Sequence, residues 1–169
     1  MKLSVLLSTI AYVTAASAAL GWSSSNGDQI RLSEDLQVPG SNPLLFCEDP
    51  TDNILTIDNV DLDPNPPEAG KKLSIVASGT LHKDIEPGAK VHLQVKFGLI
   101  TLINQEADLC DQVKNVELEC PLKAGDLTLT KEVDLPAQIP PGKYSVLADV
   151  YTKDKEKITC LTADVWFHR

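Results

Sequence analysis

Short runs of valine, isoleucine, leucine and threonine recur through most of this 169-residue chain, and they are separated by clusters of proline, glycine and aspartate. Proline fixes its own φ angle and cannot donate a hydrogen bond to a strand ladder, so strands should end at 64–67, 86–88 and 140–142. Short strands with regular breaks are typical of an all-β sandwich or barrel. About seven strands are expected, at Leu44–Glu48, Ile54–Asp61, Lys72–Leu81, Lys90–Leu102, Leu127–Leu135, Tyr144–Thr152 and Lys157–Phe167.

The clearest alternation lies in the fourth of these stretches. Val91 and Phe97 fall on one face of the strand, whereas His92 and Lys96 fall on the other. One face should therefore meet an apolar core and the other should meet solvent. The pattern changes at Gly98, after which apolar residues occupy both faces, and this change indicates a bulge or bend. We found no stretch with a helical period.

The N-terminal residues resemble an export signal. Residues 1–18 contain an early lysine, an apolar stretch and the small-residue ending Ala16–Ser17–Ala18. Residues 19–42 are polar with little periodicity, so we expect a flexible leader or a removed pro-segment. The folded domain should then span 43–169, which is the length of a single domain. Export places the protein in the secretory pathway, either in a vacuolar or lysosomal lumen or outside the cell.

The chain has four cysteines, Cys47, Cys110, Cys120 and Cys160. In an exported protein, an even number of cysteines indicates disulfides more often than a metal site or a catalytic thiol. No C-x-x-C pair occurs and the three histidines are scattered, so no metal site is expected. Four cysteines allow three pairings, and the sequence does not select one. We favour a bond from Cys47 to Cys160, which ties the ends of the domain together, and a local bond from Cys110 to Cys120.

Charge and motifs argue against several classes of function. The chain has 15 basic and 24 acidic residues, a formal net charge of -9, which does not favour nucleic acid as a partner. It has no nucleophile elbow, zinc-protease motif or phosphate loop, so we expect neither an enzyme nor a cofactor. The acidic run from Asp58 to Asn65 is not a calcium loop, because Pro66 and Lys72 replace the glycine and glutamate that such a loop needs. In an acidic lumen, protonated carboxyl groups would repel anionic membranes less, which would favour transient membrane contact.

The domain resembles the ML lipid-recognition family, which includes the Niemann-Pick type C cholesterol-binding protein, and the likeness is stronger to the fungal phosphatidylglycerol/phosphatidylinositol transfer proteins. It runs from about Pro43 to the end of the chain. The resemblance implies an immunoglobulin-like β-sandwich with a lipid cavity between its sheets, no covalent chemistry, and the two disulfides favoured above. Animal members typically have six cysteines, and this chain lacks their short bond near the first strand. The segments that carry the likeness are Leu45–Cys47, Cys120–Pro121, Pro140–Tyr144, Cys160 and Asp164–Phe167.

A lipid cavity in such a sandwich needs apolar walls. An unfilled apolar cavity costs about 24 cal/mol per Å³, so a bound lipid should stabilise the fold. Lys96, Lys131 and Lys143 are candidates for contact with an anionic head group at the mouth. The expected lipid-binding residues are Val95, Phe97, Leu99, Ile100, Leu102, Val133, Leu135, Tyr144, Val146, Val150 and Trp166.

We therefore expect a monomeric carrier that binds phospholipid (phosphatidylglycerol or phosphatidylinositol) or sterol and transfers it between membranes. The alternative is a secreted β-sandwich module that recognises a protein or glycan through its loops, since one fold can host many functions. The two hypotheses differ in the interior, because a carrier needs a hollow and a loop-binding module predicts a filled core. A hydrolase is a weaker third hypothesis, because no nucleophile has a recognisable base nearby. The sequence does not choose between the lipids or between vacuole and extracellular space.

Overall fold

The computed structural model describes residues 36–168, and the expected signal at 1–18 lies outside them. Within the described residues, no helix is both long enough and apolar enough to cross a membrane. The elements are β1 (Leu44–Phe46), η1 (Pro50–Asp52), β2 (Leu55–Asp63), β3 (Lys72–Leu81), β4 (Lys90–Phe97), β5 (Ile100–Asp108), α2 (Leu109–Val113), η2 (Lys114–Val116), β6 (Gly125–Asp134), β7 (Gly142–Tyr151) and β8 (Lys157–Phe167).

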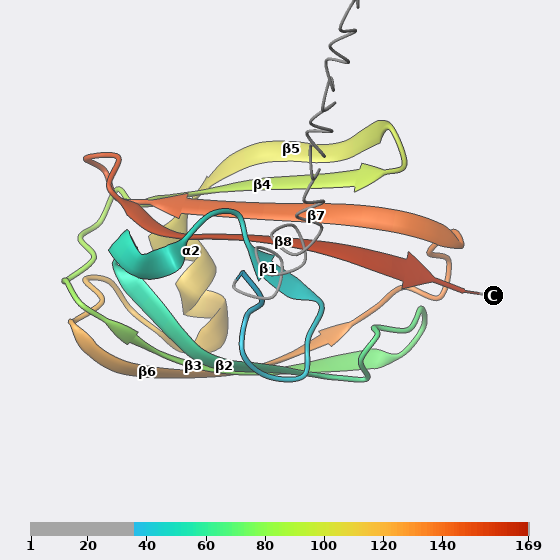
Figure 1. The fold of residues 1–169 in the computed structure, drawn as a ribbon, viewed down its shortest axis with the longest axis horizontal. Coiled ribbons are helices and arrows are strands. Elements are labelled where there is room, and N and C mark those ends of the chain that lie inside the picture. The colour runs from blue at the N-terminus through green and yellow to red at the C-terminus, as the bar shows by residue number, and fades with distance from the viewer. Residues whose placement is uncertain (1–35, 169) are drawn as a thin grey trace, which may run out of the picture.

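The strands form two antiparallel sheets that face each other as layers (Figure 1). One sheet has five strands in the order β1-β8-β7-β4-β5, and the other has three strands in the order β2-β3-β6. The expected β-sandwich is confirmed. Strands β5 and β6 are edge strands of opposite sheets, and no ladder joins them among the described residues.

The expected strand at 90–102 is two strands, which corrects the sequence interpretation. Gly98 has a φ of 55° and forms with Leu99 a two-residue turn, across which Phe97 pairs with Ile100. Glycine at positive φ suits this kind of hairpin turn because its backbone twist matches the flanking strands. The bend expected at Gly98 is thus a complete reversal of the chain. Strand β5 then continues to Asp108 with mostly exposed side chains.

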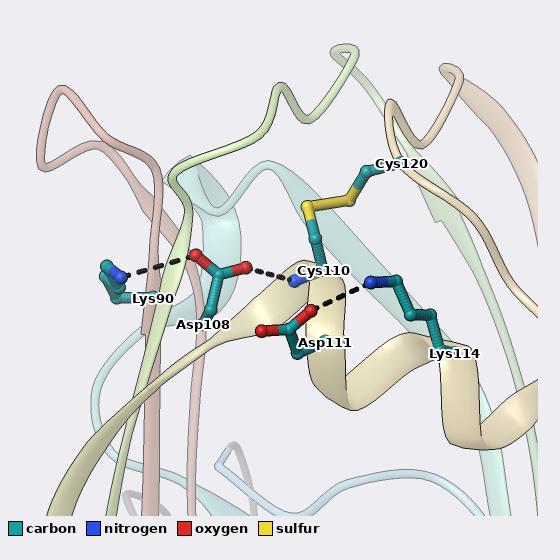
Figure 2. Close-up of a disulfide and its surroundings, with 6 residues drawn as sticks. All are labelled: Lys90, Asp108, Cys110, Asp111, Lys114 and Cys120. Atoms are coloured by element: carbon teal, nitrogen blue, oxygen red, sulfur yellow. Dashed lines mark hydrogen bonds and ion pairs between the residues drawn. A yellow bond between two sulfur atoms is a disulfide. The ribbon is translucent and has the colours of Figure 1, made fainter.

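The disulfides join Cys47 to Cys160 and Cys110 to Cys120, as favoured from the sequence. The first bond joins the chain just after β1 to β8. The second bond closes the segment between β5 and β6, which contains α2 and η2 (Figure 2). Helix α2 was not expected, because a helix of five residues is too short to show a helical period.

Asp108 links this helical segment to the five-stranded sheet (Figure 2). Its Oδ1 accepts a hydrogen bond from the Cys110 backbone N–H at 2.9 Å, and its Oδ2 lies 3.3 Å from Lys90 Nζ on the neighbouring strand. The Lys90 side chain holds the pKa of Asp108 below its ordinary value, and the Cys110 backbone N–H acts in the same direction. Asp108 thereby caps α2, because its side chain satisfies a backbone donor at the helix start.

The solid part of the interior lies where β3 ends and β8 begins. Five buried residues, which we call the Leu81 cluster, fill this end together with Val150 and side chains of the α2 segment. A smaller group, the Val38 cluster, lies beside β1 and β2 and consists of Val38, Phe46 and Val60. The Leu81 cluster consists of Leu81, Ile85, Ala89, Leu122 and Ile158.

Residues 36–42, which were expected to belong to the leader, are packed against the domain. Val38 is completely buried, and Gln37 forms an isolated bridge to Leu45. The Asn42 side-chain amide donates to the Val60 carbonyl at 2.8 Å. The packed chain therefore includes residues 36–42, ahead of the expected start at residue 43. Sequence periodicity did not reveal this segment because it contributes only two apolar side chains to the core.

Candidate functional site

An apolar hollow lies between the sheets beside the Leu81 cluster. It has a volume of about 300 Å³, and we call it the first cavity. Of the described residues that line it, only Ser78 and Thr159 have polar side chains. Its lining comes from both sheets and from the α2–β6 segment, namely Leu44, Leu55, Ile57, Val60, Ile75, Ala77, Ser78, Gly79, Leu118, Leu127, Leu129, Thr159 and Leu161.

The second cavity lies toward the end where β3 and β7 begin and β8 ends. Its volume is about 290 Å³. The Tyr144 ring belongs to its wall and contacts two other rings, with centroid distances of 4.9 Å to Phe97 and 5.4 Å to Phe167. The Tyr144 hydroxyl donates to the Pro140 carbonyl at 3.1 Å, so its polar group is satisfied. The lining consists of Pro67, Leu73, Val95, Leu135, Ile139, Pro140, Tyr144, Val146, Val165 and Phe167.

Small residues on the inner faces help to keep the interior hollow. Ala77 and Gly79 occupy inward positions of β3 and line the first cavity, where they contribute at most a methyl group. Gly79 also has a local reason, because a Cβ atom there would lie 2.5 Å from the Thr56 carbonyl oxygen of the neighbouring strand β2. Protein interiors are normally packed as tightly as organic crystals, so two hollows of this size are unusual for a filled core. The interior is suited to an apolar guest.

The sandwich is open along the side between β5 and β6. Val133 lies on the inner face of β6, opposite Leu73 of β3, and it is 36% exposed. Ile103 lies on the inner face of β5, opposite Val95 of β4, and it is 39% exposed. Apolar residues on inner faces normally meet the facing sheet, so their exposure marks the side where the two sheets separate. Inward-facing side chains are therefore open to solvent along this side.

The structure brings part of the expected lipid-binding set together. Val95, Leu135, Tyr144 and Val146 line the second cavity, and Phe97 contacts Tyr144 at its edge. Val95, Phe97, Tyr144 and Val146 share the inner faces of the adjacent strands β4 and β7, which is the arrangement that their alternation indicates, whereas Leu135 follows β6 of the other sheet.

The other expected residues lie elsewhere. Leu99 is exposed at the tip of the β4–β5 hairpin, and Ile100 and Leu102 are exposed on β5, which is the edge strand of its sheet. Trp166 is 55% exposed on the outer face of β8, where it pairs with Lys143. Val133 lies at the open side, and Val150 packs against the Leu81 cluster.

Sequence reasoning missed the first cavity almost entirely. Most of its wall is formed by β2, β3 and the start of β6, and β1, β8 and Leu118 supply the rest. Inward residues alternate regularly along β3, for example at Leu73, Ile75 and Ala77, and this pattern was a usable signal for the inner face. It could not show that the opposite sheet stands away from these residues.

The three candidate lysines occupy different places. Lys143 lies 2.8 Å from Asp164 on the outer face, and this bond together with one from Ser145 holds the pKa of Asp164 below its ordinary value. Lys96 is also on the outer face of its strand, opposite Ser145. Lys131 is on the inner face of β6, opposite Ile75. Among residues 36–168, no group of three or more histidine, cysteine, aspartate or glutamate side chains is placed to hold a metal ion.

Two facing antiparallel sheets around apolar cavities define a hollow β-sandwich. A family model described as the ML domain matches residues 41–167. The chain belongs to the ML domain family. A solved structure with the same fold is that of a Niemann-Pick type C2 protein from Japanese carpenter ant, with a TM-score of 0.50 and 15% identity over 73% of this chain and 97% of that one.

Several curated relatives are much more similar in sequence. A phosphatidylglycerol/phosphatidylinositol transfer protein of Aspergillus fumigatus is 58% identical over 91% of this chain and 87% of its own length. A protein of the same name from Neurospora crassa is 52% identical over 96% of this chain and 94% of its own length. A third protein of this name, from Candida albicans, is 46% identical over 85% of this chain and 74% of its own length.

Proposed function

We propose that this protein is a carrier that takes a phospholipid from one membrane, holds its acyl part between the two sheets and delivers it to another membrane without chemical change. The apolar first cavity is the observation that supports this function best. Burial of each acyl methylene contributes about 0.8 kcal/mol, so partial enclosure of a chain offsets much of the cost of leaving a bilayer. A module that recognises partners through its loops would instead predict a filled interior.

Phospholipid is the ligand class that we favour. The fungal relatives at 46–58% identity are named as phosphatidylglycerol/phosphatidylinositol transfer proteins, and the similarity covers most of this chain. The two disulfides support passage through the secretory pathway, because such bonds persist in oxidising compartments. We place the carrier in a vacuolar lumen or outside the cell, where it acts as a monomer.

Transfer requires contact with membranes, and we assign this contact to the β4–β5 hairpin. Leu99 is fully exposed at its tip, and Ile100 and Leu102 are both more than half exposed. The hairpin forms one edge of the five-stranded sheet (Figure 1), beside the open side of the sandwich. Apolar side chains at such a position would enter the interfacial region of a bilayer at the place where a lipid leaves the cavity.

The experiment that tests the carrier function has two parts. The protein is purified without denaturant and its bound lipid is identified by mass spectrometry. Transfer of fluorescent phosphatidylglycerol between vesicles is then measured at pH 5 and pH 7. We expect co-purified phospholipid and faster transfer at pH 5, where partly protonated carboxyl groups reduce repulsion from anionic vesicles. Lipid-free protein that transfers nothing at either pH would contradict the proposal.

A further inference from the structure

One charged residue interrupts the apolar inner face of β6. The residues that face inward along this strand are Leu127, Leu129, Lys131 and Val133, and they pair in continuous register with inward residues of β3. Lys131 lies opposite Ile75, which lines the first cavity together with Leu129. The lysine side chain is half-buried. The hydrogen bond of its ammonium group is exposed, so the charged end reaches solvent while the apolar stem starts from the inner face.

The ammonium group of Lys131 has little contact with the protein. Its Nζ donates one hydrogen bond, at 2.7 Å, to the Asn115 backbone carbonyl in η2. An ammonium group has three N–H donors, so two more are free of protein partners in the described part of the chain. Within residues 36–168, eight lysines have a carboxylate oxygen within 4.0 Å, but Lys131 has none.

Lys131 lies at the boundary between the two cavities. Leu129, two residues before it, lines the first cavity, and Leu135, four residues after it, lines the second. Leu118 also lines the first cavity and follows closely after Asn115, the residue that holds the lysine Nζ. Because β6 is the edge strand on the open side, the ammonium group lies at the rim through which a ligand enters.

We propose that Lys131 binds the phosphodiester of the phospholipid at this rim, while the acyl chains extend into the apolar space between the sheets. This inference rests on the carrier function proposed above. A phosphate oxygen can accept the free N–H donors in a charge-assisted hydrogen bond, which is stronger than a bond between neutral groups. Lys96 and Lys143 cannot take this part because both lie on the outer face of the other sheet.

The test compares two lipids with the same acyl chains, phosphatidylglycerol and diacylglycerol, which lacks the phosphate. Equilibrium binding of each is measured for the full protein and for Lys131→Met. We expect the variant to bind phosphatidylglycerol roughly tenfold or more weakly, the loss typical of one hydrogen bond to a charged group. Diacylglycerol binding should change less than about twofold, since the methionine keeps the apolar stem of the side chain.

Two further variants serve as controls. Lys131→Arg keeps the charge and should retain most of the affinity for phosphatidylglycerol. Lys153→Met removes one positive charge from the β7–β8 turn. Like Lys131, Lys153 has no carboxylate oxygen within 4.0 Å among the described residues. This variant should bind both lipids as the unmodified protein does. Glycerol 3-phosphate at millimolar concentration should not displace phosphatidylglycerol, because it lacks the acyl chains.

Each contrary result has a distinct meaning. Equal phosphatidylglycerol binding by Lys131→Met and the unmodified protein would overturn the assignment of Lys131 and leave the carrier function intact. Parallel loss of both lipids would assign Lys131 a structural part and also overturn the inference. Displacement by glycerol 3-phosphate would indicate a site for free phosphate and would overturn it too. Absence of binding of either lipid by the unmodified protein would overturn both the carrier function and this inference.

Discussion

Gly142 shows how closely a single residue controls the shape of the second cavity. It begins β7 with a φ of 144°, a region that side chains with a Cβ rarely adopt. A Cβ atom here would lie 2.6 Å from Cε2 of Phe97, whose ring packs against Tyr144 in the cavity wall. The absence of a side chain at this position therefore leaves room for the ring.

We predict that Gly142→Ala destabilises the protein through both backbone strain and this clash. Gly125→Ala is the matched control, because Gly125 has a similar φ of 132° and a Cβ atom there would have no neighbour within 4 Å. The free energy of unfolding, measured by chemical denaturation, should fall further in Gly142→Ala by about 1–3 kcal/mol, the usual cost of overpacking. Equal losses in the two variants would show that Phe97 does not constrain this position.

The residues of the second cavity could be predicted better than those of the first. Val95, Tyr144 and Val146 stand in strands with clear alternation, and alternation identifies the face that points inward. It does not show where two sheets separate, which depends on strands far apart in the sequence. Ile75 and Leu129 look like ordinary core residues for that reason, although both line the first cavity.

The β4–β5 hairpin is the element that most changes the sequence interpretation. Its apolar residues were expected to face the lipid inside the sandwich, but a two-residue turn carries Leu99 and Ile100 to the surface. Strand β5 itself was missed because residues 103–108 are mainly polar and have weak strand propensity. It pairs along its whole length with β4, so the neighbouring strand determines its conformation more than its own composition does.

If this hairpin docks on membranes, Leu99→Asp should slow lipid transfer several-fold, because a carboxylate replaces an apolar contact with the bilayer. Lipid binding should be unchanged, since Leu99 contacts neither cavity. Val76→Asp is the control, because Val76 is 41% exposed on the outer face of β3. Vesicle-to-vesicle transfer and equilibrium binding are measured for both. A transfer rate for Leu99→Asp that matches Val76→Asp would contradict the docking assignment.

At the scale of the whole molecule, several aspartates bind donors only in the folded state. Lys123 and the Ala124 backbone N–H lower the pKa of Asp84, and the Ser41 backbone N–H and the Asn59 side chain lower that of Asp61. Asp108 and Asp164 behave in the same way, as described above. A carboxyl group whose pKa is lowered by folding stabilises the fold above its unfolded pKa of about 3.9.

We therefore predict that the contribution of these aspartates to the free energy of unfolding is constant between pH 7 and pH 5. It should decline as the pH falls below about 4 and through the lowered pKa values of the folded state, because protonation then removes the bonds. Chemical denaturation at pH 7, 5 and 3 measures this dependence. A marked loss of stability already between pH 7 and pH 5 would contradict this assignment and would point to other titrating groups.

Across the whole molecule, two sheets enclose an apolar space, and we propose that this space holds a phospholipid. Ala77 and Val76 are neighbours on β3 that face opposite sides, the first into the first cavity and the second toward solvent. Ala77→Phe should fill part of a cavity of about 300 Å³, whereas Val76→Phe adds a ring on the outside of the same strand. The two variants therefore separate the hollow from the surface.

Native mass spectrometry of the purified protein and of these two variants shows whether the space between the sheets holds the lipid. We predict that the unmodified protein and Val76→Phe retain the mass of a bound phospholipid, and that Ala77→Phe is folded but largely lipid-free. After lipid removal, Ala77→Phe should be at least as stable as the unmodified protein, because the ring occupies space that is otherwise empty. Unmodified protein without bound lipid, or equal lipid content in both variants, would contradict the claim.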